Sequence, residues 1–106
     1  MKKKRKSKGN FNNKVWNACK RIPKGKVSTY KEIARKLDTK AYRAVGNALN
    51  KNLYSPQVPC HRVVNSDGKV GGFAFGKAKK IKMLKEEGIK FSDEKIINFE
   101  KILYRF

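Results

Sequence analysis

The sequence predicts a mainly α fold with a small β wing, a winged-helix-like arrangement that contains a helix-turn-helix. Two observations carry this prediction. Three successive segments repeat apolar residues at helical spacing, and a strand–turn–strand pattern centred on Asp67-Gly68 follows them. The length of 106 residues suits one domain. We expect a basic disordered arm over 1–10, a folded domain over 11–88 and a packed tail over 89–106.

The first helix is predicted over about 13–21. Its apolar stripe consists of Val15, Ala18, Cys19 and Ile22. Cys19 is therefore expected to lie in the core, where a free cysteine packs as a small apolar residue. Pro23, Lys24 and Gly25 then predict a turn.

The second helix is predicted to begin after Thr29, which forms a capping-box pattern with Glu32. Its apolar face consists of Tyr30, Ile33, Ala34 and Leu37. Because Tyr30 lies in the first turn, its hydroxyl could reach beyond the core edge. A tyrosine that only packs at the rim of the core is the alternative.

The third helix is predicted over 40–50. Its apolar face consists of Ala41, Ala44, Val45, Ala48 and Leu49, and its opposite face of Arg43, Gly46, Asn47 and Asn50. Gly46 costs about 1 kcal/mol relative to alanine in a helix interior. This cost is reasonable if another backbone, such as that of DNA, must approach closely. The alternative is a solvated face that happens to hold a glycine.

The remaining elements are a wing, a flexible loop and a last helix. The segment 62–72 predicts a hairpin around Asp67-Gly68. Glycines flank Phe73 and Phe75, which indicates a flexible aromatic loop. A last helix is predicted over 77–87 with Gly88 as its C-terminal cap. The tail over 89–106 shows no clean period, and we expect it to pack with a short strand or helix.

The charge points to a polyanionic partner. Lys and Arg number 28 against 8 Asp and Glu, a formal net charge of +20. Nucleic acid is the leading candidate, because each phosphate contact releases counterions. A basic architectural protein, of the ribosomal or chromatin type, explains the same charge. The arm over 1–10 could contact phosphates or could serve only as a solvated tail.

The cysteine count indicates a reducing, intracellular location. Two cysteines do not form a disulfide framework, and no apolar run approaches the length of a membrane span. The basic N-terminus lacks the apolar segment of a secretory signal. No metal site is predicted, since Cys19, Cys60 and His61 offer too few ligands without paired spacing.

The stretch 58–64, VPCHRVV, places the only histidine directly after Cys60. A thiol attacks as the thiolate, so a nucleophilic cysteine needs a base or a lowered pKa. His61 is the only imidazole available, and Glu87 could orient it. Asn52 could hydrogen-bond a local turn. The alternative is a small core cysteine beside a histidine by chance.

Four motifs carry a family resemblance. IPKGKVSTYKEIA, RAVGNAL, VPCHRVVNSDGKVGG and LKEEG, in this order and spacing, resemble the O6-alkylguanine-DNA alkyltransferases, also called methylated-DNA–protein-cysteine methyltransferases. The resemblance covers roughly residues 11–88 and implies an alkyltransferase DNA-binding and catalytic domain. It implies repair by direct reversal: O6-alkylguanine is flipped out of duplex DNA, and its alkyl group moves irreversibly to Cys60.

The resemblance also implies residue roles. His61 would take the proton of Cys60 through a water, Glu87 would complete the relay, and Asn52 would brace the turn. In contact with DNA, Tyr30 would press on the phosphate of the target nucleotide. Arg43 would fill the gap that the flipped base leaves in the base stack. The helix would enter the minor groove through Ala44, Gly46 and Asn47. The pocket residues would be Arg62, Val63, Phe73 and Ala74, with the carbonyls of Cys60 and Val63 reading the guanine edge. No cofactor, membrane or second subunit is implied, and we expect a monomer.

Departures from the family pattern leave two further functions open. Phe73 and Ala74 stand where the family usually has tyrosine and serine, and an N-terminal domain of another fold usually precedes this one. The loop before Pro59 and the stretch VVNSDGKV look closer to alkyltransferase-like proteins, which bind alkylated DNA with tryptophan in place of the cysteine. A damage sensor without efficient transfer is therefore the first alternative, and an architectural DNA-binding protein is the second.

Overall fold

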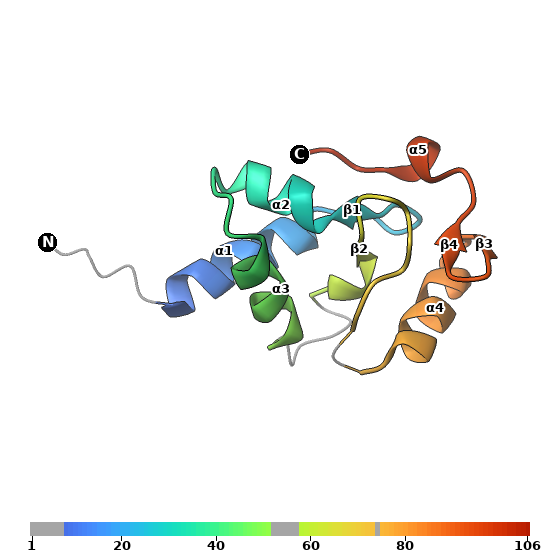
Figure 1. Ribbon diagram of the computed structural model, residues 1–106, viewed down its shortest axis with the longest axis horizontal. Coiled ribbons are helices and arrows are strands. Elements are labelled where there is room, and N and C mark those ends of the chain that lie inside the picture. The colour runs from blue at the N-terminus through green and yellow to red at the C-terminus, as the bar shows by residue number, and fades with distance from the viewer. Residues whose placement is uncertain (1–7, 52–57, 74) are drawn as a thin grey trace, which may run out of the picture.

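The computed structural model describes residues 8–51, 58–73 and 75–106. Three helices come first in the chain: α1 (Lys8–Lys20), α2 (Tyr30–Lys36) and α3 (Tyr42–Asn50). They pack against one another on one side of the molecule, and α4 (Lys77–Glu86) lies on the other side (Figure 1). The mainly helical, winged-helix-like class predicted from the sequence is confirmed. The first helix begins at Lys8, several residues before its predicted start.

The helical half encloses the larger of two apolar clusters. Its buried members from α1 to α3 are Val15, Ala18, Cys19, Ile22, Ile33, Ala34, Val45, Ala48 and Leu49. The apolar stripes predicted for α1 and α2 therefore face the core. On α3 the stripe begins later than predicted, because Ala41 is exposed and precedes the helix. The indole Nε1 of Trp16 donates to Ala48 O at 2.8 Å and joins α1 to α3.

The predicted cap of α2 is present. Thr29 is the N-cap, and its hydroxyl accepts a hydrogen bond from the backbone N–H of Glu32 at 3.0 Å. The Glu32 carboxylate lies 3.5 Å from Nε of Arg105, which belongs to the C-terminal tail. The cap therefore fixes where α2 begins, and the acidic side chain of the motif anchors the chain terminus.

The predicted hairpin over 62–72 is wrong in its pairing. A turn does form at Asp67-Gly68, where Gly68 N donates to Asn65 O at 2.9 Å. However, β2 (Val63–Val64) pairs in parallel with β1 (Ser28–Thr29), with Ser28 opposite Val63. Burial explains the difference, because every residue of β1 and β2 is buried between the helices. Parallel pairs typically occur where strands are buried in this way, and β2 is apolar at both of its residues.

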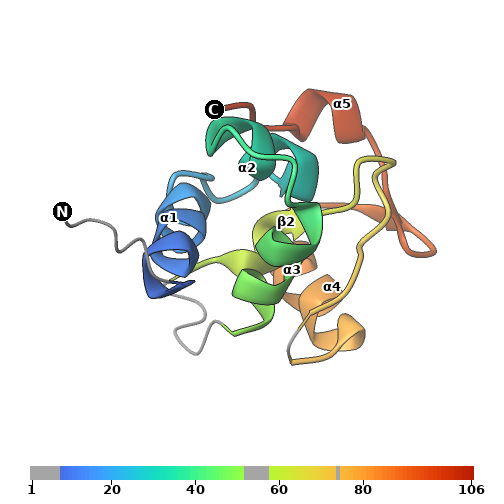
Figure 2. The same ribbon diagram turned by 60° about the vertical axis from the view of Figure 1, so that its left-hand side comes forward.

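An antiparallel hairpin lies in the C-terminal tail. Strands β3 (Phe91–Ser92) and β4 (Lys95–Ile96) pair with each other, and an isolated bridge joins Lys95 to Lys69. After α5 (Phe99–Ile102), Leu103 forms a parallel bridge to Val27 beside β1. The tail thus runs back from α5 past Val27, and the C-terminus lies beside α2 (Figure 2).

Helix α4 ends as its sequence predicted. Gly88 has a φ of +92°, a conformation that glycine adopts without steric cost. Its N–H donates to Lys85 O at 3.0 Å, and the N–H of Ile89 donates to Leu84 O at 3.1 Å. These two bonds form a Schellman motif. The motif matters for the site, because it fixes the direction of the preceding residue, Glu87.

Candidate active site

Cys60 occupies a buried turn at the centre of the molecule. It begins the 3₁₀ helix Cys60–Arg62, which leads directly into β2. Cys60 N donates to Val58 O at 2.8 Å, and the carbonyl of Cys60 accepts from the N–H of Val63. Only 4% of Cys60 is exposed. The thiol is therefore held on a rigid backbone rather than on a mobile loop.

His61 and Glu87 meet, as the sequence predicted they could. The Nε2 atom of His61 lies 3.0 Å from Oε2 of Glu87, although 26 residues separate them in the chain. His61 is 1% exposed. The 3₁₀ helix supplies the imidazole and the end of α4 supplies the carboxylate. The site therefore depends on how α4 packs against the 3₁₀ helix.

The imidazole has a defined tautomer. An ionised carboxylate only accepts hydrogen bonds, so Nε2 of His61 carries the proton that it donates to Glu87. Burial is the largest influence on His61 and lowers its pKa, although Glu87 acts in the opposite direction. The ring is therefore neutral at neutral pH, and Nδ1 bears the free lone pair. Among the described residues, this buried Nδ1 has no hydrogen-bond partner.

Arg62 fixes the carboxylate. Its guanidinium donates to both oxygens of Glu87, from Nε at 2.9 Å and from Nη2 at 2.7 Å, and to Ile22 O at 2.8 Å. Burial alone would raise the pKa of Glu87, but the hydrogen bonds from Arg62 and His61 outweigh it and lower that pKa. The sequence suggested Arg62 as a pocket residue. The structure directs its side chain to Glu87, whose carboxylate it holds in place.

The two cysteines differ in their surroundings. Cys19 is fully buried in the first apolar cluster, and burial strongly raises the pKa of its thiol. Such a thiol stays protonated and unreactive. Cys60 directly precedes an imidazole whose lone pair can take a proton. The expectation that Cys19 packs as core is confirmed, and Cys60 is the candidate nucleophile.

Lys80 is a site residue that sequence reasoning missed. It lies on α4, it is 0% exposed, and its ammonium donates to the carbonyls of Val63 and Gly72. The sequence offered one signal. Leu84 lies four residues later on the buried face of α4. Residues four apart share one face of a helix, so this spacing predicts that Lys80 points inward as well. The four other lysines of α4 concealed that position.

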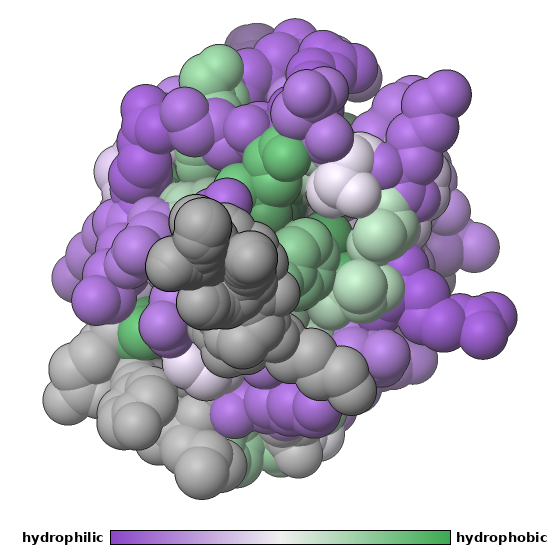
Figure 3. All heavy atoms as spheres, turned by 90° about the vertical axis from the view of Figure 1, so that its left-hand side faces the viewer, coloured by the Kyte–Doolittle hydropathy of each residue, from purple (hydrophilic) through white to green (hydrophobic). Residues whose placement is uncertain are grey.

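The proposed DNA face is exposed. On α3, Arg43 and Asn47 are exposed and Ala44 and Gly46 are half-buried. One side of the molecule is largely hydrophilic, with apolar side chains interspersed (Figure 3). A Cβ placed on Gly46 would have no atom of the protein within 4 Å. The glycine is therefore not required by internal packing.

Tyr30 and the pocket loop lie together. The Tyr30 hydroxyl donates to Gly72 O at 3.5 Å. Gly71, at a φ of +74°, needs glycine, because a Cβ would come within 3.0 Å of Asn65 Oδ1 and 3.3 Å of Tyr30 Oη. Phe73 packs against the cluster that contains Cys60, and its ring meets that of Phe75 edge-on at 5.4 Å. Asn52 and Ala74 lie outside the described residues.

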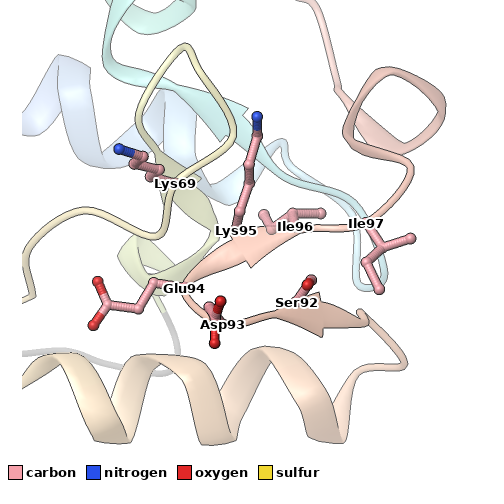
Figure 4. A pocket seen from close by; sticks show the side chains of 7 residues that line it. All are labelled: Lys69, Ser92, Asp93, Glu94, Lys95, Ile96 and Ile97. Carbon is pink, nitrogen blue, oxygen red and sulfur yellow. The ribbon is translucent and has the colours of Figure 1, made fainter.

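One surface hollow lies away from the buried turn of Cys60. It measures about 670 Å³ and surrounds the β3–β4 hairpin (Figure 4). Its lining residues are Lys69, Ser92, Asp93, Glu94, Lys95, Ile96 and Ile97. A smaller hollow of about 350 Å³ is lined by Tyr30, Lys31, Tyr42 and Ser66, beside the N-terminal end of α3. The second is the one that adjoins the proposed DNA face.

Two further findings concern metals and membranes. In residues 8–51, 58–73 and 75–106, the metal-binding types His, Cys, Asp and Glu form no group of three or more that could hold a metal ion. None of the helices in that same part of the chain is long and apolar enough to cross a membrane.

Most of the chain is similar to known proteins. Residues 10–89 match the family model described as 6-O-methylguanine DNA methyltransferase, DNA binding domain. A methylated-DNA–protein-cysteine methyltransferase from Methanosarcina acetivorans is 49% identical over 79 residues, which cover 74% of this chain and 51% of that protein. The chain thus spans about half the length of the curated relatives it matches.

Two solved structures show the range of the similarity. The O6-methylguanine-DNA methyltransferase of Pyrococcus kodakaraensis matches 74% of this chain and 46% of its own, at 42% identity and a TM-score of 0.68. S. pombe Atl1, in complex with damaged DNA containing O6-carboxymethylguanine, matches 100% of both chains at 32% identity and a TM-score of 0.77. The second match extends over the whole chain, including the C-terminal tail.

Proposed function

The chain belongs to the family of 6-O-methylguanine DNA methyltransferase DNA-binding domains, and from that premise we propose that it removes alkyl groups from guanine O6 in duplex DNA. The acceptor is the thiol of Cys60. The observation that supports transfer most directly is the neutral His61, oriented by Glu87 and adjacent to that thiol.

Proton transfer comes first. Nε2–H of His61 is held by Glu87, so Nδ1 is the nitrogen that takes the thiol proton through a water. The carboxylate stabilises the imidazolium that results, and Arg62 keeps that carboxylate ionised. A base, an orienting carboxylate and a nucleophile in this relation are typical of activated thiols.

Alkyl transfer follows from the thiolate. The sulfur of Cys60 attacks the alkyl carbon, a C–S bond forms and the C–O6 bond breaks. The bonding electron pair stays on guanine, which takes up a proton at N1. The thioether product has no good leaving group, so each protein molecule reacts once. No redox step or metal is needed for this displacement.

The reaction requires the base to leave the duplex, which costs a few kcal/mol. Arg43 extends from the exposed face of α3 and would occupy the gap, and inserted side chains offset lost stacking in this way. Ala44, Gly46 and Asn47 would let the helix approach the minor groove. Tyr30 would press on the phosphate of the extruded nucleotide.

Guanine would be read by backbone groups. The family resemblance gives this role to the carbonyls of Cys60 and Val63, and both belong to the buried turn. A carbonyl oxygen has two lone pairs, so each can accept a second hydrogen bond beyond its internal one. Phe73 and Ala74 would close the pocket from the loop, and Asn52 would brace the turn.

Intact mass tests the proposal. The protein is incubated with a duplex that contains one O6-methylguanine and is then weighed and digested. Transfer adds one methylene, about 14 Da, to the peptide that contains Cys60. Cys60→Ala should gain nothing and should still bind DNA. Since Cys19 is buried with a raised pKa, its peptide is an internal control that stays unmodified.

A damage sensor is the second candidate, and one observation favours it. The Atl1 structure with damaged DNA matches the whole chain, including the tail. Phe73 and Ala74 also replace hydroxyl-bearing residues of the pocket loop. A sensor would bind the damaged duplex more tightly than the undamaged one and would show no change in mass. Retention of Cys60 and its oriented base favours transfer.

A further inference from the structure

Lys80 is a charged side chain in an unusual place. Lysine is almost never fully buried without a partner, yet Lys80 is 0% exposed and points into the middle of the molecule. Its ammonium donates to Val63 O at 2.5 Å and to Gly72 O at 2.9 Å. The nitrogen also lies 5.9 Å from the centre of the Tyr30 ring, within cation–π range.

The two carbonyls belong to two different segments of the chain. Val63 follows the 3₁₀ helix, and its N–H holds the carbonyl of Cys60. Gly72 begins the loop that carries Phe73, and its carbonyl also accepts from the Tyr30 hydroxyl. One ammonium therefore connects the turn of the nucleophile to the pocket loop. Lys80 is the only described side chain that donates to both segments.

Ionisable groups of several elements surround Lys80. Burial is the largest influence and lowers the pKa of Lys80 to about 7, while the thiol groups of Cys60 and Cys19 act against this. Tyr30 faces it from α2, and His61 is close enough for the Lys80 charge to lower its pKa further. An ammonium in this position gains or loses its proton near neutral pH.

We propose that Lys80 is a positioning residue whose ammonium latches the pocket loop at Gly72 to the nucleophile turn at Val63. The inference rests on the proposed function, because it assigns a purpose to the shape of that pocket. Hydrogen bonds from a charged donor are roughly twice as strong as neutral ones. Loss of the proton therefore loosens both bonds together and frees the loop.

The latch predicts that lesion recognition declines as pH rises above neutral. A general base such as His61 would make the opposite contribution, because it becomes more available as pH rises. The pH dependence of the loop, measured without DNA, separates the two. This readout also keeps failure of the latch distinct from failure of the proposed function.

The first measurement is NMR hydrogen exchange of the Gly76 amide, which closes the loop by donating to Phe73 O at 3.0 Å. After correction for intrinsic exchange, its protection should fall about tenfold or more between pH 6 and pH 8.5, as one group with a pKa near 7 loses its proton. The Gly68 amide, which donates to Asn65 O, is the internal control. Flat protection of Gly76 in the unmodified protein would overturn the latch.

Lys80→Met is the matched variant, because methionine has a similar length and no charge. At pH 6 its Gly76 amide should exchange about as fast as that of the unmodified protein at pH 8.5. Lys82→Met, on the exposed side of the same helix, removes the same charge and should change nothing. If Lys80→Met fails to fold, the pH series of the unmodified protein still decides the question.

The second measurement uses DNA. In a Cys60→Ser background, the ratio of affinities for O6-methylguanine duplex and undamaged duplex is followed from pH 6 to pH 8.5. The ratio should fall severalfold with rising pH, and Lys80→Met should give a low ratio that does not vary. A steady ratio beside a pH-dependent loop would refute the role of the latch in recognition. No lesion preference at any pH, with a pH-dependent loop, would refute the proposed function alone.

Discussion

The buried relay and the exposed face of α3 are built on opposite principles. In the relay, His61, Glu87 and Arg62 are each largely buried, and Glu87 is hydrogen-bonded to the other two at 3.0 Å or less. On α3, Arg43 and Asn47 are exposed, and Gly46 faces open space. The relay must hold one geometry for a chemical step, whereas α3 must leave room for the surface of the DNA that it would bind.

This difference predicts how each region responds to substitution. Changes in the relay should affect transfer strongly and DNA binding little. Changes on α3 should affect binding and base extrusion, and they should leave the buried geometry intact. The following variants test that division, from the largest expected effect to the smallest.

Glu87→Gln should slow transfer by about 10²-fold or more, which is within the range of general acid–base catalysis. The amide no longer stabilises the imidazolium that His61 would form. Single-turnover kinetics on a duplex with one O6-methylguanine provide the measurement. Glu86→Gln, on the adjacent exposed residue, is the control with the same loss of charge. Equal rates for the two variants would contradict the relay.

Arg62→Met should slow transfer by about tenfold at neutral pH. In the pH–rate profile of transfer, the decline at low pH (the acid limb) should move to higher pH. Arg62 lowers the pKa of Glu87 through hydrogen bonds and lowers that of His61 through its charge. Its removal raises both, so Glu87 becomes protonated, and His61 becomes charged, at a higher pH than before. Transfer rates from pH 5 to pH 8 measure the shift. Arg105→Met, which removes an exposed arginine far from Glu87 in the chain, should leave the limb in place.

Arg43→Ala should slow transfer severalfold to about tenfold, and it should weaken binding to undamaged duplex much less. The expected loss lies in extrusion of the base, which an inserted side chain supports. Transfer rates and binding isotherms at one salt concentration give both quantities. Arg35→Ala on α2 removes the same charge and should lower both modestly. Equal losses in transfer and binding for Arg43→Ala would contradict the proposal that this side chain fills the gap in the base stack.

Gly46→Ala is the smallest change and the sharpest test of the face. Because an added Cβ has no internal atom within 4 Å, the free energy of unfolding should rise by about 0.5–1 kcal/mol. DNA affinity should fall severalfold, since a methyl group would separate the helix from the groove. Denaturant melts and binding isotherms measure the pair. An alanine variant that binds DNA unchanged would show that nothing approaches α3 at this residue.

The elements that the sequence predicted correctly depend on local chemistry. The Thr29 cap, the Gly88 terminus of α4 and the apolar stripes of α1 and α2 involve residues within a few positions of each other. The hairpin over 62–72 failed for the converse reason. Its strand residues found partners in Ser28–Thr29, far back in the chain, because the helices bury both strands.

The site divides in the same way. By itself, the sequence determined that Cys60 and His61 are neighbours and that Cys19 belongs to an apolar stripe. Both follow from the order of the residues alone, the first from chain connectivity and the second from helical spacing. Only the tertiary structure decided that Glu87 reaches His61, that Arg62 turns to that carboxylate and that Lys80 is buried between two carbonyls. The contacts of Glu87 and Lys80 with residues 61–63 join segments 17 to 26 residues apart in the chain, so their geometry depends on how α4 packs against the 3₁₀ helix and β2.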